Sequence, residues 1–219
     1  MDASDKKRIA AKAALDFVES GTILGVGTGS TVNYLIEMLP GIRDRIDAVV
    51  SSSKASTELL QEQGFDVQTL NETGDIDVYI DGADECNKRL HLIKGGGGAL
   101  TREKVLAAAA RRFVCIVDDS KFVGMLGTFP VPIEVLPMAQ EFIVRKLMKM
   151  RVQPIWRDGF VTDNGNHILD VHGLQIANPI EMEARLNRIP GIVTVGIFAH
   201  RGADILLIAD DSGVREMRA

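Results

Sequence analysis

Apolar residues along the first half of the chain follow two alternating patterns. Ile9, Ala13 and Phe17 repeat every four residues, which predicts an amphipathic helix that stops at Ser20-Gly21. The segment Thr22–Val26 that follows is short, apolar and β-branched, which predicts a buried strand. The same alternation predicts further strands at 48–51, 65–69, 76–81 and 113–117, and helices at 31–39, 54–63 and 100–112. Apolar strands that alternate with helices indicate a parallel sheet covered on both faces, with ligands at the carboxyl ends of its strands.

The pattern changes after Lys121. From Val131 it predicts strand, helix, strand, strand, helix and strand, a split βαβ module of about 70 residues. After the first strand, these elements are expected at 138–150, 152–157, 167–171, 179–189 and 192–198, with a tight turn at 163–166. The predicted fold class is α/β, with a Rossmann-like parallel sheet domain (1–127 with 203–219) and a smaller α+β, ferredoxin-like domain (128–202). Residues 204–209 form another apolar strand that either sheet could take.

The composition is that of a folded and moderately acidic protein. Of its 219 residues 46% are hydrophobic, which is enough for a sizeable core. A formal net charge of -5, without a block of like charge, disfavours nucleic acids and membrane surfaces as partners. No apolar run approaches the roughly 20 residues needed to span a bilayer. Cys86 and Cys115 stand alone, which fits a reducing compartment, and we expect the cytoplasm.

Four consecutive glycines, Gly95–Gly98, stand between Lys94 and a predicted helix that carries Glu103. Each glycine costs roughly 0.5 to 1 kcal/mol relative to alanine, so the tract indicates backbone amides that lie close against a small polar ligand. Lys94 offers a positive charge and Glu103 a carboxylate, a pair suited to proton abstraction with charge stabilisation. Taken alone, the tract could also be a flexible loop with two solvated charges.

The segment Gly27-Thr28-Gly29-Ser30-Thr31 follows a predicted strand and opens a predicted helix. Its free N–H groups and three hydroxyls suit a phosphate or another anion. Because Ser30 stands where the GxGxxG fingerprint needs its last glycine, a compact phosphorylated ligand is favoured over NAD. Lys121, just after the strand 113–117, could reach the same edge as a phosphate counter-ion. A hydroxyl-rich helix cap with nothing bound is the alternative.

Asp81-Gly82-Ala83-Asp84-Glu85 comes at the end of another predicted strand, at the edge where the anion pocket should lie. Asp81 and Asp84 could hold sugar hydroxyls or relay protons. They could instead bind a divalent metal through their oxygens. Lys94 argues against a metal, because a lysine can neutralise a developing oxyanion by itself. The four histidines are scattered along the chain and predict no metal site, and an ordinary acidic turn is the alternative for the aspartates.

Together these motifs resemble type A ribose-5-phosphate isomerase over nearly the whole chain. The similar segments, in the family's order, are Gly25–Thr31, Ser51–Ser53, Asp81–Glu85, Lys94–Glu103 and Asp118–Lys121, followed by 162–166 and 189–196. Five site motifs in register are far more specific than any one of them. The departures are Cys86 and Lys88 in the acidic turn, and Gly98, where some relatives carry alanine. None of these removes a reacting group.

The resemblance implies reversible conversion of ribose 5-phosphate to ribulose 5-phosphate through an enediolate in the pentose phosphate pathway, without metal or organic cofactor. Glu103 would move a proton between C2 and C1, and Lys94 would steady the negative oxygen. Asp81 and Asp84 would handle hydroxyl protons and ring opening. The expected substrate-binding residues are Thr28, Gly29, Ser30, Thr31, Gly82, Ala83, Gly95, Gly96, Gly97 and Lys121, of which Thr28 to Thr31 and Lys121 would hold the phosphate. The resemblance also implies a homodimer or a higher homo-oligomer.

Two other classes of function could use the same sheet and anion pocket. A sugar-phosphate sensor would bind without reacting, but only about 20 residues precede the first strand, too few for a DNA-reading helix pair. An acyl carrier of the coenzyme A transferase kind would form a covalent intermediate on Glu103. The isomerase hypothesis accounts for more of the motifs than either alternative.

Overall fold

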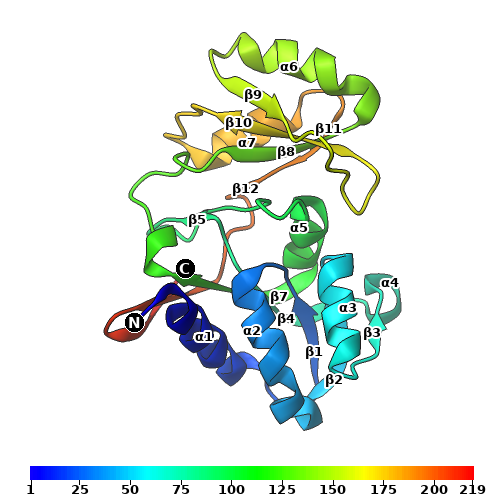
Figure 1. Ribbon diagram of the computed structural model, residues 1–219, viewed down its shortest axis with the longest axis vertical. Helices are drawn as coiled ribbons and strands as arrows, with labels where there is room; N and C mark the ends of the chain where they lie inside the picture. Colours follow the sequence, from blue (N-terminus) through cyan, green and yellow to red (C-terminus); the bar gives the residue numbers. More distant parts are fainter. The chain divides into compact units, whose positions relative to one another are not determined.

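The computed structural model describes residues 1–219, which divide into two compact units (Figure 1). Unit 1 comprises Met1–Ala83, Arg102–Phe122 and Ala203–Ala219, and unit 2 comprises Asp84–Thr101 and Val123–Gly202. The units differ from the domain boundaries expected from the sequence in two segments, 84–101 and 123–127, which pack with unit 2. The first of these segments carries β6 (Leu92–Ile93), whose antiparallel partner is β12 (Ile197–Phe198) of the same unit.

Unit 1 is built on a seven-stranded sheet in the order β14-β13-β7-β4-β1-β2-β3. Its strands are β1 (Thr22–Val26), β2 (Ile46–Ser51), β3 (Val67–Gln68), β4 (Ile76–Asp81), β7 (Ala110–Asp118), β13 (Ile205–Asp210) and β14 (Gly213–Arg218). All neighbours are parallel except β13 and β14, which form an antiparallel hairpin. This order confirms the Rossmann-like sheet, and the strand predicted at 204–209 lies in it beside β7.

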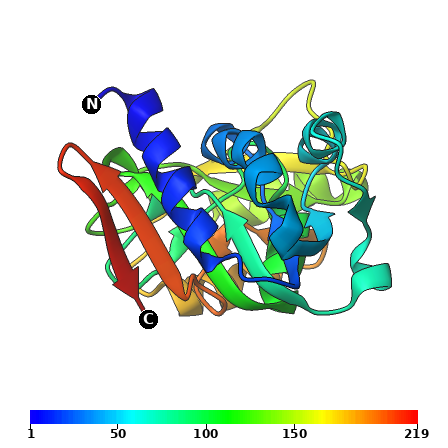
Figure 2. The ribbon, with the colours of Figure 1, turned by 90° about the horizontal axis from the view of Figure 1, so that it is seen from below.

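The helices of the first half are α1 (Ala3–Ala14), α2 (Ser30–Met38), α3 (Lys54–Glu62), α4 (Leu70–Thr73) and α5 (Leu100–Ala109). Helices α1 and α2 lie side by side against the sheet (Figure 2). Their contact is close because α1 turns small side chains inward, and Ala10, Ala11 and Ala14 are fully buried. The 3-10 turns η1 (Leu15–Phe17) and η2 (Leu39–Arg45) lead from α1 to β1 and from α2 to β2, and η3 (Asp119–Lys121) follows β7.

Unit 2 contains a four-stranded antiparallel sheet in the order β11-β8-β10-β9. The elements are β8 (Val131–Val135), η4 (Pro137–Ala139), α6 (Gln140–Met148), β9 (Gln153–Trp156), β10 (His167–His172), α7 (Pro179–Asn187) and β11 (Ile192–Val195). In chain order the sheet reads fourth, first, third, second strand, which is the arrangement of a split βαβ module, as predicted. Its core is formed by aliphatic residues of β8, β10, α6 and α7, such as Ile133, Leu169, Ile143 and Leu186.

A single strand was expected at 192–198, and the structure breaks it in two at Gly196. β11 stays in the four-stranded sheet, whereas β12 joins a three-stranded sheet with β6 and β5 (Glu85–Cys86). The Gly196 amide donates to the Pro132 carbonyl, and the Gly196 carbonyl accepts from the Lys94 amide at 2.9 Å. A β-carbon on Gly196 would lie 2.3 Å from the Lys94 carbonyl oxygen, so only glycine allows this crossing of backbones.

Candidate active site

The carboxyl ends of three neighbouring strands bring several of the predicted site residues of unit 1 to one edge of its sheet. β1 ends at Val26, immediately before the segment Gly27–Thr31, which we call the anion loop. β4 ends at Asp81 and β7 ends at Asp118, just before the turn that carries Lys121. Because β4 pairs in parallel with both β1 and β7, these three ends lie at the same edge. The convergence predicted for this edge is therefore present within unit 1.

The anion loop leads directly into α2. Gly29 is the N-cap residue and has a φ of +106°, a conformation that side chains rarely adopt. No side chain caps α2, so its first N–H groups are available at the helix end, where the helix dipole favours an anion. The Ser53 hydroxyl donates to the Thr28 hydroxyl at 3.1 Å, which fixes one of the loop's three hydroxyl groups.

Asp81 holds the anion loop in place. It is fully buried, and its Oδ1 accepts hydrogen bonds from the amides of Thr28, at 3.1 Å, and Gly82, at 2.7 Å. Its Oδ2 accepts from the hydroxyl of Tyr79. A β-carbon on Gly27 would lie 2.0 Å from the Asp81 carboxylate, so the glycine lets the loop pass over this side chain. Asp81 is thus engaged by donors on both of its oxygens.

Tyr79 is the buried partner of Asp81 on β4. Its ring is fully buried and packs against Phe113, with the ring centroids 5.0 Å apart. Burial raises the pKa of the Tyr79 hydroxyl well above its ordinary value, and the negative charges of Asp81 and Glu103 raise this pKa further. The hydroxyl therefore stays protonated and serves as a donor. Glu103, which lies on α5 and is 3% exposed, is therefore buried close enough to Tyr79 for its charge to act on this hydroxyl.

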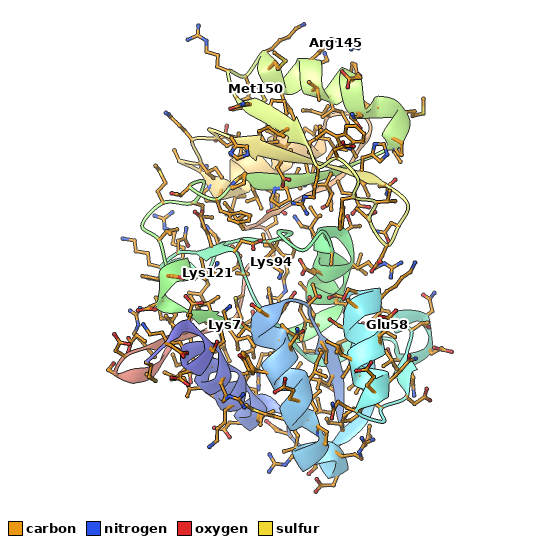
Figure 3. The ribbon with its side chains drawn as sticks, in the orientation of Figure 1. Lys7, Glu58, Lys94, Lys121, Arg145 and Met150 are labelled. Atoms are coloured by element: carbon orange, nitrogen blue, oxygen red, sulfur yellow. The ribbon has the colours of Figure 1, made fainter.

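Two lysines of unit 1, both labelled in Figure 3, border a cavity of about 320 Å³. Lys121, a predicted site residue, comes from η3, and Lys7 comes from α1 and donates to the Ser30 hydroxyl at 2.9 Å. Lys7 was not predicted, because no local motif links it to Ser30, which is 23 residues away. The cavity is lined by Ala3, Lys6, Lys7, Asp118, Asp119, Ser120 and Lys121.

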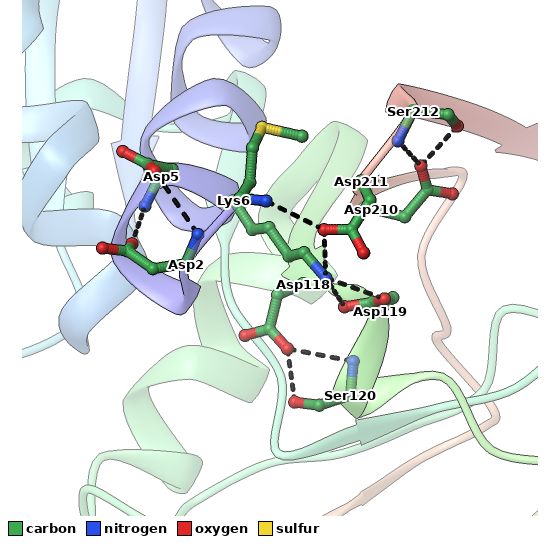
Figure 4. Close-up of polar contacts among 10 residues, drawn as sticks. Asp2, Asp5, Lys6, Asp118, Asp119, Ser120, Asp210, Asp211 and Ser212 are labelled. Carbon is green, nitrogen blue, oxygen red and sulfur yellow. Dashed lines mark hydrogen bonds and ion pairs between the residues drawn. The ribbon is translucent and has the colours of Figure 1, made fainter.

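Lys6, next to Lys7 in sequence, has a different role. Its ammonium forms ion pairs with Asp119 at 3.1 Å and with Asp211 at 3.2 Å (Figure 4). Hydrogen bonds to these two carboxylates raise the pKa of Lys6. The positive charge of Lys6 is therefore compensated by these two carboxylates.

In unit 2 the predicted residues gather at the loop that follows β6, Lys94–Gly98, which we call the glycine loop. Lys94 is only 2% exposed, and its Nζ lies 5.7 Å from the centroid of the Phe198 ring. The Asp84 Oδ2 accepts a hydrogen bond from the Gly96 amide at 2.8 Å. The structure thus connects Asp84, from the acidic turn, to the glycine loop that begins with Lys94.

The four positions of this loop require glycine to different degrees and for different reasons. Gly95 and Gly98 have φ angles of +103° and +84°, and a β-carbon on Gly98 would lie 2.2 Å from the ring of Phe160. A β-carbon on Gly96 would lie 2.5 Å from Asp84 Oδ1. Gly97 has nothing within 4 Å of that position. In this chain, therefore, alanine at position 98 would be strained, and Gly97 is the glycine with open space above its backbone.

The predicted turn at 163–166 serves a structural purpose. Glu134 is fully buried on β8, and its Oε1 accepts from Thr162 at 2.9 Å, from Asn164 at 3.1 Å and from Asn166 at 2.8 Å. The hydroxyl of Thr101, in the first turn of α5, donates to the other oxygen of this carboxylate. A buried carboxylate needs such donors, because an unpaired charge in the interior costs several kcal/mol.

The predicted residues are therefore distributed over both units. Unit 1 holds Thr28, Gly29, Ser30, Thr31, Asp81, Gly82, Ala83, Glu103 and Lys121, and unit 2 holds Asp84, Lys94, Gly95, Gly96 and Gly97. No group of three or more His, Cys, Asp and Glu side chains is arranged to hold a metal ion. None of the helices is both long and apolar enough to cross a membrane.

Comparison with known proteins decides which family this arrangement represents. The family model described as ribose 5-phosphate isomerase A (phosphoriboisomerase A) matches residues 48–213, which is more than half of the chain. The chain belongs to the ribose 5-phosphate isomerase A family. The fold supports the same conclusion over the remaining residues, including the anion loop, because solved structures of the family match the chain over nearly its full length.

Three solved structures illustrate this similarity. Ribose 5 phosphate isomerase A from Neisseria gonorrhoeae is 46% identical, with a TM-score of 0.97, and the match covers 99% of this chain and 97% of that one. The enzyme from Methanocaldococcus jannaschii is 37% identical, with a TM-score of 0.94 and complete coverage of both chains. A D-ribose-5-phosphate isomerase in complex with phospho-erythronic acid is 39% identical, with a TM-score of 0.95 and again complete coverage. Ribose-5-phosphate isomerisation is the activity of this family member.

Proposed function

We propose that this ribose 5-phosphate isomerase A works through an enediolate, with Glu103 as the base that moves a proton between C2 and C1 and Lys94 as the cation that steadies the negative oxygen. The burial of Lys94, which is 2% exposed, carries this proposal. Lysines are rarely so deeply buried, and a buried ammonium interacts strongly with charge that develops beside it. Glu103 is 3% exposed and is likewise shielded from bulk water.

The two aspartates differ in how far their oxygens are already engaged. Asp84 is half-buried and accepts from one backbone amide, whereas the fully buried Asp81 accepts from two amides and the Tyr79 hydroxyl. We assign to Asp84 the larger share in moving hydroxyl protons during ring opening. Asp81 would hold a substrate hydroxyl and keep the anion loop in shape.

The phosphate would be held by the anion loop together with two lysines. Thr28, Gly29, Ser30 and Thr31 supply hydroxyls and helix-end amides, and Lys7 and Lys121 supply positive charge. One similar structure binds phospho-erythronic acid, a phosphorylated sugar acid, which supports a sugar phosphate as the ligand. The backbones of Gly82, Ala83, Gly95, Gly96 and Gly97 would approach the rest of the substrate.

We also propose that the enzyme is a cytoplasmic homodimer or higher homo-oligomer. Large apolar side chains are exposed on unit 2, among them Met138 of η4 at 92% and Phe142 of α6 at 38%, four residues apart in the sequence. Such side chains are often covered by a second subunit. Light scattering coupled to size-exclusion chromatography tests the assembly, and a monomer at micromolar concentration would contradict it.

The proposed chemistry needs no metal. Protein treated with EDTA and then dialysed should convert ribose 5-phosphate to its ketose at the rate of untreated protein, because Lys94 supplies the positive charge. The ketose is measured by its absorbance after derivatisation. A loss of turnover that added Mg²⁺ or Mn²⁺ restores would contradict the assignment of Lys94.

A further inference from the structure

The side chain of Arg157 forms hydrogen bonds with the backbone of the glycine loop. The chemistry proposed above gives this residue no role. It follows β9, in the connection to β10. Both Nη atoms donate to the Gly95 carbonyl at 3.3 Å, and Nη1 also donates to the Gly96 carbonyl at 3.1 Å. On its other side the guanidinium meets Asp170 of β10, with Nε at 2.9 Å and Nη2 at 2.6 Å from the carboxylate. This is the two-pronged geometry that arginine forms and lysine cannot.

The same connection touches the glycine loop at a second point. The ring of Phe160 lies against Gly98, where it occupies the space that a β-carbon would need. The Arg157 guanidinium lies over this ring, with Cζ 5.4 Å from its centroid. Gly95 and Gly98 are thus both held by one short segment, and the loop between them closes with a hydrogen bond from the Gly98 amide to the Gly95 carbonyl at 2.9 Å.

The peptide group between Gly95 and Gly96 is hydrogen-bonded to side chains through both its carbonyl oxygen and its N–H. Its carbonyl oxygen, on Gly95, accepts from Arg157, and its N–H, on Gly96, donates to Asp84. In a trans peptide these two groups point in opposite directions, so Arg157 and Asp84 fix one plane from opposite sides. Rotation of this plane would break both sets of hydrogen bonds, and two glycines cannot prevent the rotation sterically because they have no side chains.

We propose that Arg157, itself oriented by Asp170, is a positioning residue that fixes the Gly95–Gly96 peptide and thereby the carboxylate of Asp84 and the adjoining Lys94. The proposal rests on the function assigned to Asp84 and Lys94 above. Displacement of a reacting group by about 1 Å can cost on the order of 100-fold in rate. Arg157 therefore acts on the reaction through the backbone, without touching the substrate.

The test uses Arg157→Ala and Arg157→Lys in the full-length enzyme, with Arg145→Ala, an exposed arginine of α6, as the matched control. We expect Arg157→Ala to lower kcat by about 10- to 100-fold with less than about a threefold change in KM. Guanidinium chloride at tens of millimolar should restore part of kcat, and NaCl at equal ionic strength should not. Arg157→Lys should stay low in kcat, because an ammonium cannot reach both carbonyls and Asp170. Arg145→Ala should match the wild type.

Wild-type kcat in Arg157→Ala would overturn the proposal, as would a loss that guanidinium fails to restore in a protein that has the wild-type Tm. Should Arg157→Ala fail to fold, Arg157→Lys decides: a lowered kcat at unchanged Tm supports the proposal, and a wild-type kcat overturns it. Glu103→Gln, measured in parallel, separates this proposal from the proposed function. If Glu103→Gln retains turnover, the proposed chemistry fails; if it is inactive while Arg157→Ala is normal, only the positioning role fails.

Discussion

The anion loop of unit 1 and the glycine loop of unit 2 are both rich in glycine, yet different sets of side chains hold them. At the anion loop, Asp81 accepts a hydrogen bond from the Thr28 amide. At the glycine loop, Asp84 accepts from a backbone amide and Arg157 in addition donates to two backbone carbonyls. The anion loop opens a helix whose first amides have no side-chain cap, which suits binding of a charged group. The glycine loop begins with a buried lysine and donates a hydrogen bond to Asp84, which suits the proton transfers of the proposed reaction.

This contrast predicts that substitutions in the two loops affect different kinetic parameters. Changes around the glycine loop and in α5, which follows it, should act mainly on kcat. Changes in the anion loop should act mainly on KM, because a phosphate bound far from the reacting carbons is held equally in the ground state and the transition state.

Glu103→Gln is expected to have the largest effect. It keeps the shape of the side chain and removes the base, so kcat should fall by on the order of 10² to 10⁴ while substrate affinity stays near that of the wild type. Steady-state kinetics and isothermal titration with ribose 5-phosphate measure the two quantities. Glu58→Gln, at an exposed glutamate of α3, is the control. Near-normal turnover of Glu103→Gln would remove this residue from the mechanism.

Lys94→Ala should come next. If the ammonium steadies the enediolate oxygen, its removal should lower kcat by on the order of 10² to 10³, as for other oxyanion donors. Lys88→Ala, which removes an exposed lysine of the same unit, should leave kcat unchanged. A change in KM alone would assign Lys94 to substrate binding. It would also contradict the proposal that the glycine loop acts on kcat and the anion loop on KM.

Thr31→Ala should chiefly weaken binding. Loss of a hydrogen bond to a charged phosphate should cost about 1 to 3 kcal/mol of substrate affinity, with little change in kcat. Thr73→Ala, in α4, is a control away from the anion loop. An unchanged KM for Thr31→Ala would exclude its hydroxyl from the phosphate site.

The smallest effect is expected at Tyr79, and it depends on pH. Because the folded protein raises the pKa of Tyr79 above the ordinary value of about 10, the unfolded state loses this proton first as pH rises. The stabilisation is complete below pH of about 10 and is lost as pH rises toward the folded pKa. The free energy of unfolding of the wild type should thus fall above pH 10 more steeply than that of Tyr79→Phe. Parallel slopes in urea unfolding would contradict this environment for Tyr79.

The sequence predicted much of this arrangement wherever the signal was local. The bounds expected for Thr22–Val26 and Ile76–Asp81 are those of β1 and β4, because apolar β-branched runs end there at glycine or acidic turns. The helix expected at 100–112 ends earlier, at Ala109, because Ala110 and Arg112 pair with β4 as part of β7. Here tertiary pairing outweighs helix propensity.

Features that depend on distant contacts were not predictable in this way. β14 has a largely polar sequence without an apolar alternation, and it forms a strand only through its pairing with β13. Lys7 gains its importance from Ser30, and Arg157 gains its own from Gly95, 62 residues away. Glycine itself gave a clear signal in the sequence, but the side chains that hold each glycine loop come from other elements of the fold.

The transfer of the C2 proton can be followed directly with an isotope. Ribose 5-phosphate deuterated at C2 is incubated with the wild type and with Glu103→Gln, and NMR measures deuterium that leaves C2 for C1 or for water. We expect rapid loss of the label from C2 with the wild type, and loss slower by at least about 100-fold with Glu103→Gln. Equal rates in the two proteins would show that a group other than Glu103 removes the proton.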